Sequence, residues 1–257
     1  MRMQPKTFLV GFTSLDRVGL IDYLTATDNQ EFIRDVDASG LSGGECLCSF
    51  YAKLCYKSLT LGQNANVSRV RSIEDNLKSV FDSGHGSVFE HCWLNFVTTD
   101  CSRVFTHELV RHRVGTAFSQ TSGRYVAIDK IDLVIPPDLE EGRAQLEAYA
   151  QVTADLCKQL RDSLIKPDAD FATKKRITSA IRRLAPNGQT NEIGWSCNIR
   201  SLRHMIEMRT SRHAEWEIRV VFNQVADIVL SRWPLMLYGH RVEDTGDGLK
   251  EYTNLKV

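Results

Sequence analysis

The stretch 111–125 limits most strongly how this chain can fold. It opens with an Arg-His-Arg triplet, at the end of a segment in which Val104, Phe105 and Leu109 recur at helical spacing. We therefore expect a helix that ends at the triplet, because the carbonyl end of a helix favours cations. Such a helix end either meets solvent as a basic surface or lines a binding site.

The residues that follow the triplet favour the binding site. We interpret the eight residues Val114–Thr121 as a loop of small and hydroxyl-bearing residues, which leads into Ser122, Gly123, Arg124 and Tyr125. Backbone N–H groups and short hydroxyls in such a loop suit a polar, anionic ligand. A solvated helix end does not need this series, so we prefer an anion site to a basic surface.

The composition argues against several classes of protein. The chain has 257 residues with 32 basic and 32 acidic side chains, so no overall field attracts nucleic acid or an anionic membrane. No apolar run approaches the ~20 residues of a membrane span, and the N-terminus lacks a signal-peptide pattern. The seven cysteines are odd in number and scattered, which indicates reduced thiols in the cytoplasm and no metal site. We expect Cys101 and Cys197 to be buried.

The pattern along the chain predicts a single α+β domain over residues 1–257. Short or alternating apolar runs predict strands over 7–12, 92–98, 132–135 and 192–197. Helical spacing predicts helices over 45–57, 67–81, 139–164, 171–184, 198–213 and 214–233. The rest of the first 40 residues has no clear pattern, and we expect residues 241–257 to be loosely ordered.

A second group of polar side chains precedes the predicted strand 92–98, in the order His85-x-Ser87-x-x-Glu90-His91. Two histidines six residues apart match neither the helical pair of a zinc site nor a zinc finger. Taken alone, they are more typical of a structural role than of a ligand site.

A third group lies on the predicted helix that starts near Asn198. Arg200, His204 and, more loosely, Arg209 approach one face of this helix, and Arg182 precedes it. These arginines could simply extend along a surface beside core residues. Guanidinium groups also bind oxyanions bidentately, which suits a phosphomonoester.

Together the three groups resemble the signature of the flavin-dependent thymidylate synthases, in family order and over residues 50–235. The family has Arg-His-Arg, seven residues, Ser, usually a small residue, Arg and Tyr, whereas eight residues intervene here. Its other elements are His-x-Ser/Thr-Pro-x-Glu-His, Ala-Arg-x-x-Leu-Pro and Asn-x-Arg with a later His and Arg. This chain departs from them at Val88, Ile181 and Ala185, and glutamates replace the usual glutamine at Glu108 and Glu215.

The resemblance implies a fold with a central antiparallel sheet flanked by helices, and a role for each matching residue. It implies that the flavin and the adjoining folate pocket contact His85, Ser87, Glu90, Arg111, His112, Arg113, Gln120, Asn198, Arg200 and His204. It implies that a uracil nucleotide contacts Glu108, Arg111, Gln120, Ser122, Gly123, Arg124, Arg182 and Arg209. Arg209 and Ser122 then lie at the reacting centre, where Arg209 stabilises the deprotonated pyrimidine. Ser122 binds substrate and is not a nucleophile, because no base stands ready to activate it.

The implied reaction is C5-methylation of dUMP to dTMP. NADPH passes hydride to FAD, 5,10-methylenetetrahydrofolate supplies the carbon, and the flavin completes the reduction to methyl. The resemblance also implies a homotetramer whose sites are shared between subunits. The longer loop and Glu108 leave open UMP or another modified uridylate as the acceptor, in a nucleoside-antibiotic pathway. A non-catalytic nucleotide- or RNA-binding module is an alternative of a different class.

Overall fold

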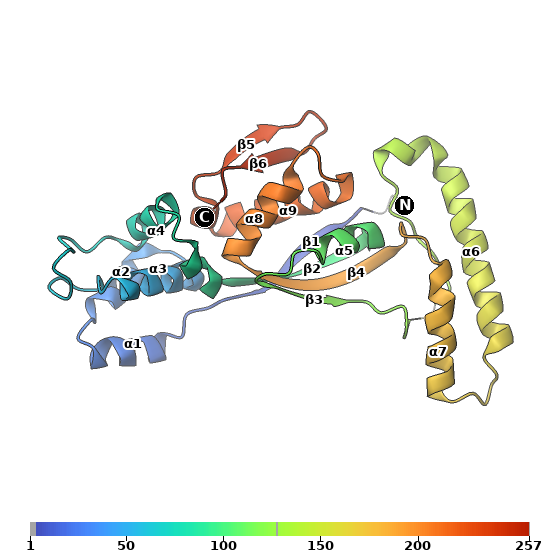
Figure 1. Ribbon diagram of the computed structural model, residues 1–257, viewed down its shortest axis with the longest axis horizontal. Coiled ribbons are helices and arrows are strands. Elements are labelled where there is room, and N and C mark those ends of the chain that lie inside the picture. The colour runs from blue at the N-terminus through green and yellow to red at the C-terminus, as the bar shows by residue number, and fades with distance from the viewer. Residues whose placement is uncertain (1–3, 127, 257) are drawn as a thin grey trace.

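The computed structural model describes residues 4–126 and 128–256. At the centre of these residues lies a four-stranded sheet in which all neighbouring strands run antiparallel (Figure 1). In spatial order its strands are β1 (Lys6–Phe12), β2 (Trp93–Ser102), β4 (Thr190–Asn198) and β3 (Thr116–Gln120). Helices surround this sheet, which confirms the α+β class and the flanked antiparallel sheet expected from the sequence.

One face of the sheet packs against three helices, α5 (Arg103–Leu109), α8 (Ile199–Thr210) and α9 (Trp216–Arg232), as Figure 1 shows. Alternate side chains of β2 and β4 are buried on this face because side chains in a strand alternate between its two sides. Phe96 and Trp195 stack there with ring centroids 4.6 Å apart, and Trp195 also meets Phe222 of α9. This core holds in place the ends of α5, β4 and α8, where the expected site residues lie.

The N-terminal helices gather at one end of the sheet (Figure 1). They are α1 (Arg17–Ala26), α2 (Glu31–Ser39), α3 (Gly43–Cys55) and α4 (Ile73–Asp82), followed by the short 3₁₀ helix η1 (Gly86–His91). The sequence reading assigned no helix before residue 45. The expected helix over 67–81 was also too long, because α4 begins after Ser72, whose hydroxyl accepts the N–H of Asp75 as an N-cap.

A pair of helices stands at the other end of the sheet (Figure 1). The 3₁₀ helix η2 (Pro137–Gly142) leads into α6 (Arg143–Leu164), and α7 (Phe171–Ile181) leads into η3 (Arg182–Leu184). The strand expected over 132–135 is reduced to one bridge between Leu133 and Gln189. Pro136 and Pro137 follow at once, and proline has no N–H with which to extend a ladder.

The C-terminal segment is ordered, contrary to the expectation of a loose tail. After η4 (Pro234–Leu237) it forms a hairpin of β5 (Arg241–Asp244) and β6 (Lys250–Thr253). Tyr252 and Leu255 are buried, and the guanidinium of Arg203 donates to the carbonyls of Leu255, Met236 and Tyr238. The mostly polar sequence of residues 241–257 gave no sign of this order, because a strand with one buried face needs an apolar residue only at every second position.

Candidate functional site

The Arg-His-Arg triplet follows the last turn of α5, as expected. The hydroxyl of Ser102 caps the start of this helix, and the helix ends at Leu109. The backbone N–H of Arg111 donates to the carbonyl of Glu108, and that of His112 to the carbonyl of Leu109. These two bonds continue the helical path by one turn and fix where the triplet points.

The residues after the triplet form a strand, and their interpretation as a loop over Val114–Thr121 was wrong. Thr116–Gln120 is strand β3, which pairs antiparallel with β4, so that Phe118 lies opposite Trp195. Hydroxyl-bearing residues suggested a loop, but a strand at the edge of a sheet has one solvated face that accepts them. The triplet and Ser122 therefore lie at opposite ends of an extended strand.

Gly115 fixes the start of β3 against the N-terminus of α8. Its φ is +64°, and its carbonyl accepts the backbone N–H of Asn198 at 3.0 Å. A Cβ at this position would lie 2.3 Å from Asn198 Nδ2 and 2.4 Å from Ser201 Oγ. Asn198 Oδ1 in turn caps α8 by accepting the Ser201 N–H, and Ser201 Oγ donates to the carbonyl of Val114. Asn198, expected to contact the flavin, is thus buried and holds the loop to the helix.

Arg209 is held by His112 and Glu108. Arg209 Nε donates to His112 Nε2 at 2.8 Å, Nη1 donates to Glu108 Oε2 at 3.0 Å, and Nη2 donates to the Glu108 carbonyl at 3.3 Å. Since a guanidinium cannot accept hydrogen bonds, His112 Nε2 must be unprotonated. Burial, and then the charge of Arg209, lower the pKa of His112 to about 4. His112 is therefore neutral at physiological pH and carries its proton on Nδ1.

A cavity of about 470 Å³, here called the α8 cavity, opens beside this cluster. Most of the side chains expected to bind the flavin line it, namely Glu90, Arg111, His112, Arg113, Arg200 and His204. Arg200 Nη1 donates to Glu90 Oε1 at 2.6 Å, whereas the guanidiniums of Arg111 and Arg113 have no hydrogen-bond or salt-bridge partner among the described residues. Two unpaired guanidiniums suit the pyrophosphate of FAD, so the residues present fit this cofactor.

The residues expected at the folate pocket belong to the turn that leads into β2. This segment is the 3₁₀ helix η1 rather than the loop-to-strand passage expected from the sequence. The side chain of His85 receives a hydrogen bond from, or donates one to, Tyr56, with 3.0 Å between His85 Nδ1 and the phenol oxygen. Ser87 is exposed, and Val88, which replaces the common proline, is buried in the core.

The residues expected at the nucleotide phosphate lie elsewhere. Gly123 and Arg182 line a cavity of about 580 Å³, here called the Arg182 cavity. They lie close together, since a Cβ on Gly123 would be 3.6 Å from Arg182 Cδ. Ser122 Oγ accepts the backbone N–H of Arg124 at 3.3 Å, and Arg124 is exposed. No histidine or carboxylate bonds Ser122 in the described residues.

The two cavities lie at opposite ends of β3, which at five residues spans roughly 17 Å. Gln120 lies near the far end of this strand, where its Nε2 donates to Thr106 Oγ1 of α5. Arg209 and the triplet are therefore near one end, and Arg182 and Arg124 near the other. Within one chain the described residues form two groups, and do not gather around one ligand.

A buried carboxyl that the sequence reading missed supports α5. Glu217 of α9 accepts the backbone N–H of Ser102 at 2.6 Å and also bonds the Ser102 hydroxyl. Burial raises the pKa of Glu217 to about 7. The missed residues that support the site, Gly115, Ser201 and Glu217, act on backbone geometry. Gly115, directly after Arg-His-Arg-Val, could have been recognised as a position with positive φ. The sequence around Ser201 and Glu217 contains no comparable signal.

Metal ligands, membrane-spanning helices and the two cysteines Cys101 and Cys197 can also be assessed in the structure. In residues 4–126 and 128–256, no three histidine, cysteine or carboxylate side chains come together as metal ligands would. None of the helices in the same ranges combines the length and the apolar character needed to span a membrane. Cys101 and Cys197 are buried, as expected, and burial raises the pKa of Cys101 to about 12.

Comparison with known proteins gives four consistent similarities. Residues 38–235 match the family model described as thymidylate synthase complementing protein. A flavin-dependent thymidylate synthase from Mycobacteroides abscessus is 32% identical over 209 residues, which cover 77% of this chain and 82% of that protein. One from Mycobacterium tuberculosis is 31% identical over 220 residues, or 82% and 86% of the two chains. The crystal structure of thymidylate synthase X from Helicobacter pylori with FAD and dUMP covers 87% of this chain and 92% of that one, with a TM-score of 0.54 and 18% identity, and supports the fold.

Proposed function

Because the chain belongs to the flavin-dependent thymidylate synthase family, we propose that it methylates carbon 5 of dUMP to give dTMP. FAD is the proposed cofactor, NADPH the reductant and 5,10-methylenetetrahydrofolate the carbon donor. We place this activity in the cytoplasm, which is supported by the unpaired state of the seven cysteines. A single domain over residues 1–257 is supported by the large core cluster, whose residues run from Leu20 to Leu255, beside which Ile131, Ala150 and Ala154 form a smaller cluster.

The observation that carries the proposal is the fixed guanidinium of Arg209. A guanidinium has five N–H donors, and His112 and Glu108 take three of them. Five minus three leaves two N–H groups, on a side chain that cannot turn freely. Directed at a pyrimidine, these donors stabilise the negative charge that develops when a ring nitrogen loses its proton, which makes carbon 5 nucleophilic. Fixed donors are most effective for this purpose because they need not reorganise.

The α8 cavity is the proposed place for FAD. Arg111 and Arg113 would bind its phosphates, and Arg200, His204 and neutral His112 would contact its polar ring edges. FAD, when bound, supplies the hydride chemistry that amino-acid side chains lack. The residues of the chain orient the reactants and supply charge. Glu90 holds Arg200, and Gly115 holds the triplet against α8.

The Arg182 cavity is the proposed place for the phosphate of the nucleotide. Arg182 and Arg124 supply the positive charge, and Ser122 and Gly123 supply a hydroxyl and backbone close to it. Since β3 separates this group from Arg209, we propose that each site combines the α8 cavity of one subunit with the Arg182 group of another, in a homotetramer. The separation of the two groups supports this sharing.

The test is an assay of the purified protein with FAD, NADPH, 5,10-methylenetetrahydrofolate and dUMP. We expect a flavin spectrum, NADPH oxidation that depends on dUMP, and formation of dTMP. A colourless protein that binds nucleotide without oxidising NADPH would overturn the proposal and favour the non-catalytic nucleotide- or RNA-binding module.

A second candidate acceptor is UMP or a related modified uridylate, which Glu108 favours. Its carboxylate lies at 3.0 Å from Arg209, and a hydrogen bond from an added hydroxyl to a charged carboxylate is stronger than one to the neutral amide oxygen of a glutamine. The same assay with UMP decides between them. Turnover of UMP at least equal to that of dUMP would make UMP the substrate.

A further inference from the structure

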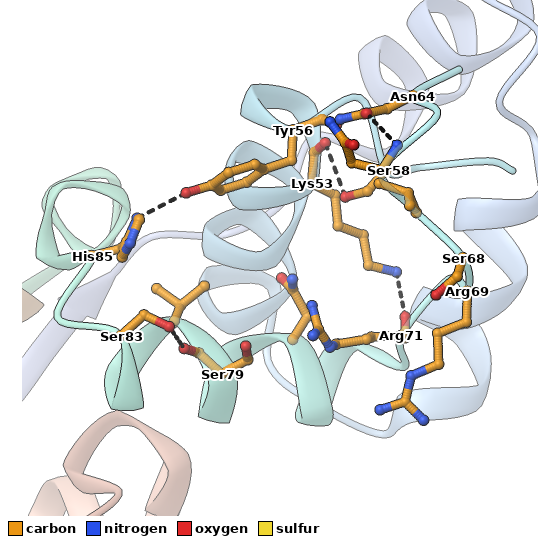
Figure 2. Close-up of a pocket in the computed structure, with 14 residues that line it drawn as sticks. Lys53, Tyr56, Ser58, Asn64, Ser68, Arg69, Arg71, Ser79, Ser83 and His85 are labelled. Carbon is orange, nitrogen blue, oxygen red and sulfur yellow. Dashed lines mark hydrogen bonds between the residues drawn. The ribbon is translucent and has the colours of Figure 1, made fainter. Parts of the chain in front are cut away.

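A third cavity, of about 390 Å³, lies between α3 and α4 and is here called the α3–α4 pocket. Its walls come from the end of α3, from the segment 56–72 that joins the two helices, from α4 and from His85 (Figure 2). The expected flavin residues that line the α8 cavity do not line this pocket. It is therefore a separate hollow, on the N-terminal side of η1.

The charged side chains that line this pocket are all basic. Its lining contains three basic side chains, Lys53, Arg69 and Arg71, together with His85 and several amide and hydroxyl side chains, and it contains no carboxylate. The whole chain, in contrast, has equal numbers of acidic and basic side chains. A concave surface lined by one sign of charge concentrates ligands of the opposite sign.

The cations of the pocket divide into one that is used by the fold and two that are not. Lys53 is 1% exposed, and its Nζ donates to the carbonyl of Arg71 at 2.7 Å and pairs with Asp35 at 3.4 Å. This buried lysine fixes the backbone that carries the arginines. The guanidiniums of Arg69 and Arg71 have no hydrogen-bond or salt-bridge partner among the described residues. Figure 2 shows them across the pocket from Tyr56 and His85.

A buried amide adds a second, independent sign of a ligand. Asn76 of α4 lines the pocket although its side chain belongs to a residue only 8% exposed. Its Oδ1 accepts the hydroxyl of Ser49, whereas its Nδ2 has no partner in the described part of the chain. Among the described residues, Nδ2 is not one of the fully enclosed side-chain atoms that lack a partner, so solvent reaches it, and Asn76 lines the pocket. An N–H donor left free at the wall of a cationic pocket suits an oxyanion.

The 3₁₀ helix η1 runs from the pocket to the α8 cavity. His85 lines the pocket at the start of η1, and Glu90, near its end, lines the α8 cavity. At about 2 Å per residue, this 3₁₀ helix covers roughly 10 Å. A cosubstrate with a reactive ring and a charged arm is long enough to reach from one cavity to the other.

We propose that the α3–α4 pocket binds the oxyanion-bearing arm of a cosubstrate whose reactive ring lies at the α8 cavity, with Arg69, Arg71 and Asn76 as its donors. This inference rests on the proposed function. Two sources share the required chemistry, the carboxylates of a folate glutamyl chain and the added phosphate of NADPH. Arg69 and Arg71 are thus residues that set specificity for the cosubstrate.

The experiment compares the FAD-loaded protein with its variant Arg69→Gln/Arg71→Gln by titration calorimetry. The ligands are unreactive and paired: NADP⁺ with NAD⁺, which lacks the added phosphate, and folate triglutamate with folate monoglutamate. We expect the variant to bind one of the more highly charged ligands about tenfold or more weakly, and to lose the preference within that pair. If only the preference for NADP⁺ is lost, the pocket binds the added phosphate, and if only the preference for folate triglutamate is lost, it binds the glutamyl chain. Loss of both preferences means that the pocket binds the charged arm of either cosubstrate.

The control variant Lys158→Gln/Arg232→Gln removes the same charge from exposed residues of α6 and α9 that have no salt-bridge partner in the described ranges. Dissociation constants that stay within twofold for all four ligands, or that rise equally in the control, would overturn the inference, as would a wild-type protein that binds none of the four. Flavin content and dUMP turnover of the wild type test the proposed function separately. A protein that turns over dUMP normally while Arg69→Gln/Arg71→Gln changes no constant refutes the pocket alone.

Discussion

Substitution of Gly115 by alanine tests how the Arg-His-Arg triplet is held. A positive φ costs an L-residue about 1–2 kcal/mol. The added Cβ would also lie within 2.4 Å of two polar atoms on α8, Asn198 Nδ2 and Ser201 Oγ. Forcing a methyl group into such a packed place typically costs about 1–3 kcal/mol. We therefore expect Gly115→Ala to lower the free energy of unfolding by about 2–5 kcal/mol in total.

Gly40 provides a matched control because its φ is +65° and a Cβ there meets nothing within 4 Å. Gly40→Ala should lower the free energy of unfolding only by the cost of the positive φ, about 1–2 kcal/mol. Urea unfolding of both apoproteins at one protein concentration, with flavin content measured in parallel, separates the two contributions. We expect Gly115→Ala alone to lose flavin. Equal unfolding free energies and equal flavin content in the two variants would refute the role given to Gly115.

Three further predictions follow from the site and from buried groups. Arg209→Lys loses the fork that engages His112 and Glu108, so we expect kcat to fall about a hundredfold or more while flavin content is kept, with the exposed Arg212→Lys as control; normal turnover would contradict the role of Arg209. Glu217 has its pKa raised to about 7 by burial, so its contribution to stability is present below the unfolded value of 4.5 and is lost as pH rises towards 7. As pH rises from 5 to 8, the free energy of unfolding of Glu217→Gln should therefore increase by up to about 3 kcal/mol relative to that of the wild type. Urea unfolding at a series of pH values measures this difference, and a difference that does not change with pH would contradict the prediction. Iodoacetamide should modify the native protein first at exposed Cys55 without loss of activity, as mass spectrometry and the dTMP assay can show, whereas inactivation through Cys101 or Cys197 would argue for a cysteine nucleophile.

Much of the fold could be predicted because apolar spacing reports which faces are buried. The helices 171–184 and 198–213 and the strand 192–197 all lie where the structure has α7, α8 and β4. The elements that were missed depend on distant partners. Strand β3 exists because β4 offers it an edge, and the C-terminal hairpin is ordered because Arg203 reaches its carbonyls. Neither partner is visible in local spacing.

The candidate site was predicted as a set of residues but not as an arrangement. The order of motifs named the triplet, Arg182 and Arg209, and the resemblance gave each a role. Sequence order cannot show that a strand of five residues keeps Arg182 apart from Arg209, since that requires the register of β3 on β4. It also cannot show that His112 is neutral, which follows from burial and from the Arg209 charge.

The central claim, that one site combines the Arg209 cluster of one subunit with the Arg182 group of another, is tested most directly by mixing two inactive variants. Arg209→Gln and Arg182→Gln should each be inactive as homo-oligomers. If subunits exchange at random, about a quarter of the sites in a mixed oligomer join two unchanged groups, and activity should return to about that fraction. Mixed oligomers that form but remain as inactive as either variant alone would contradict the account.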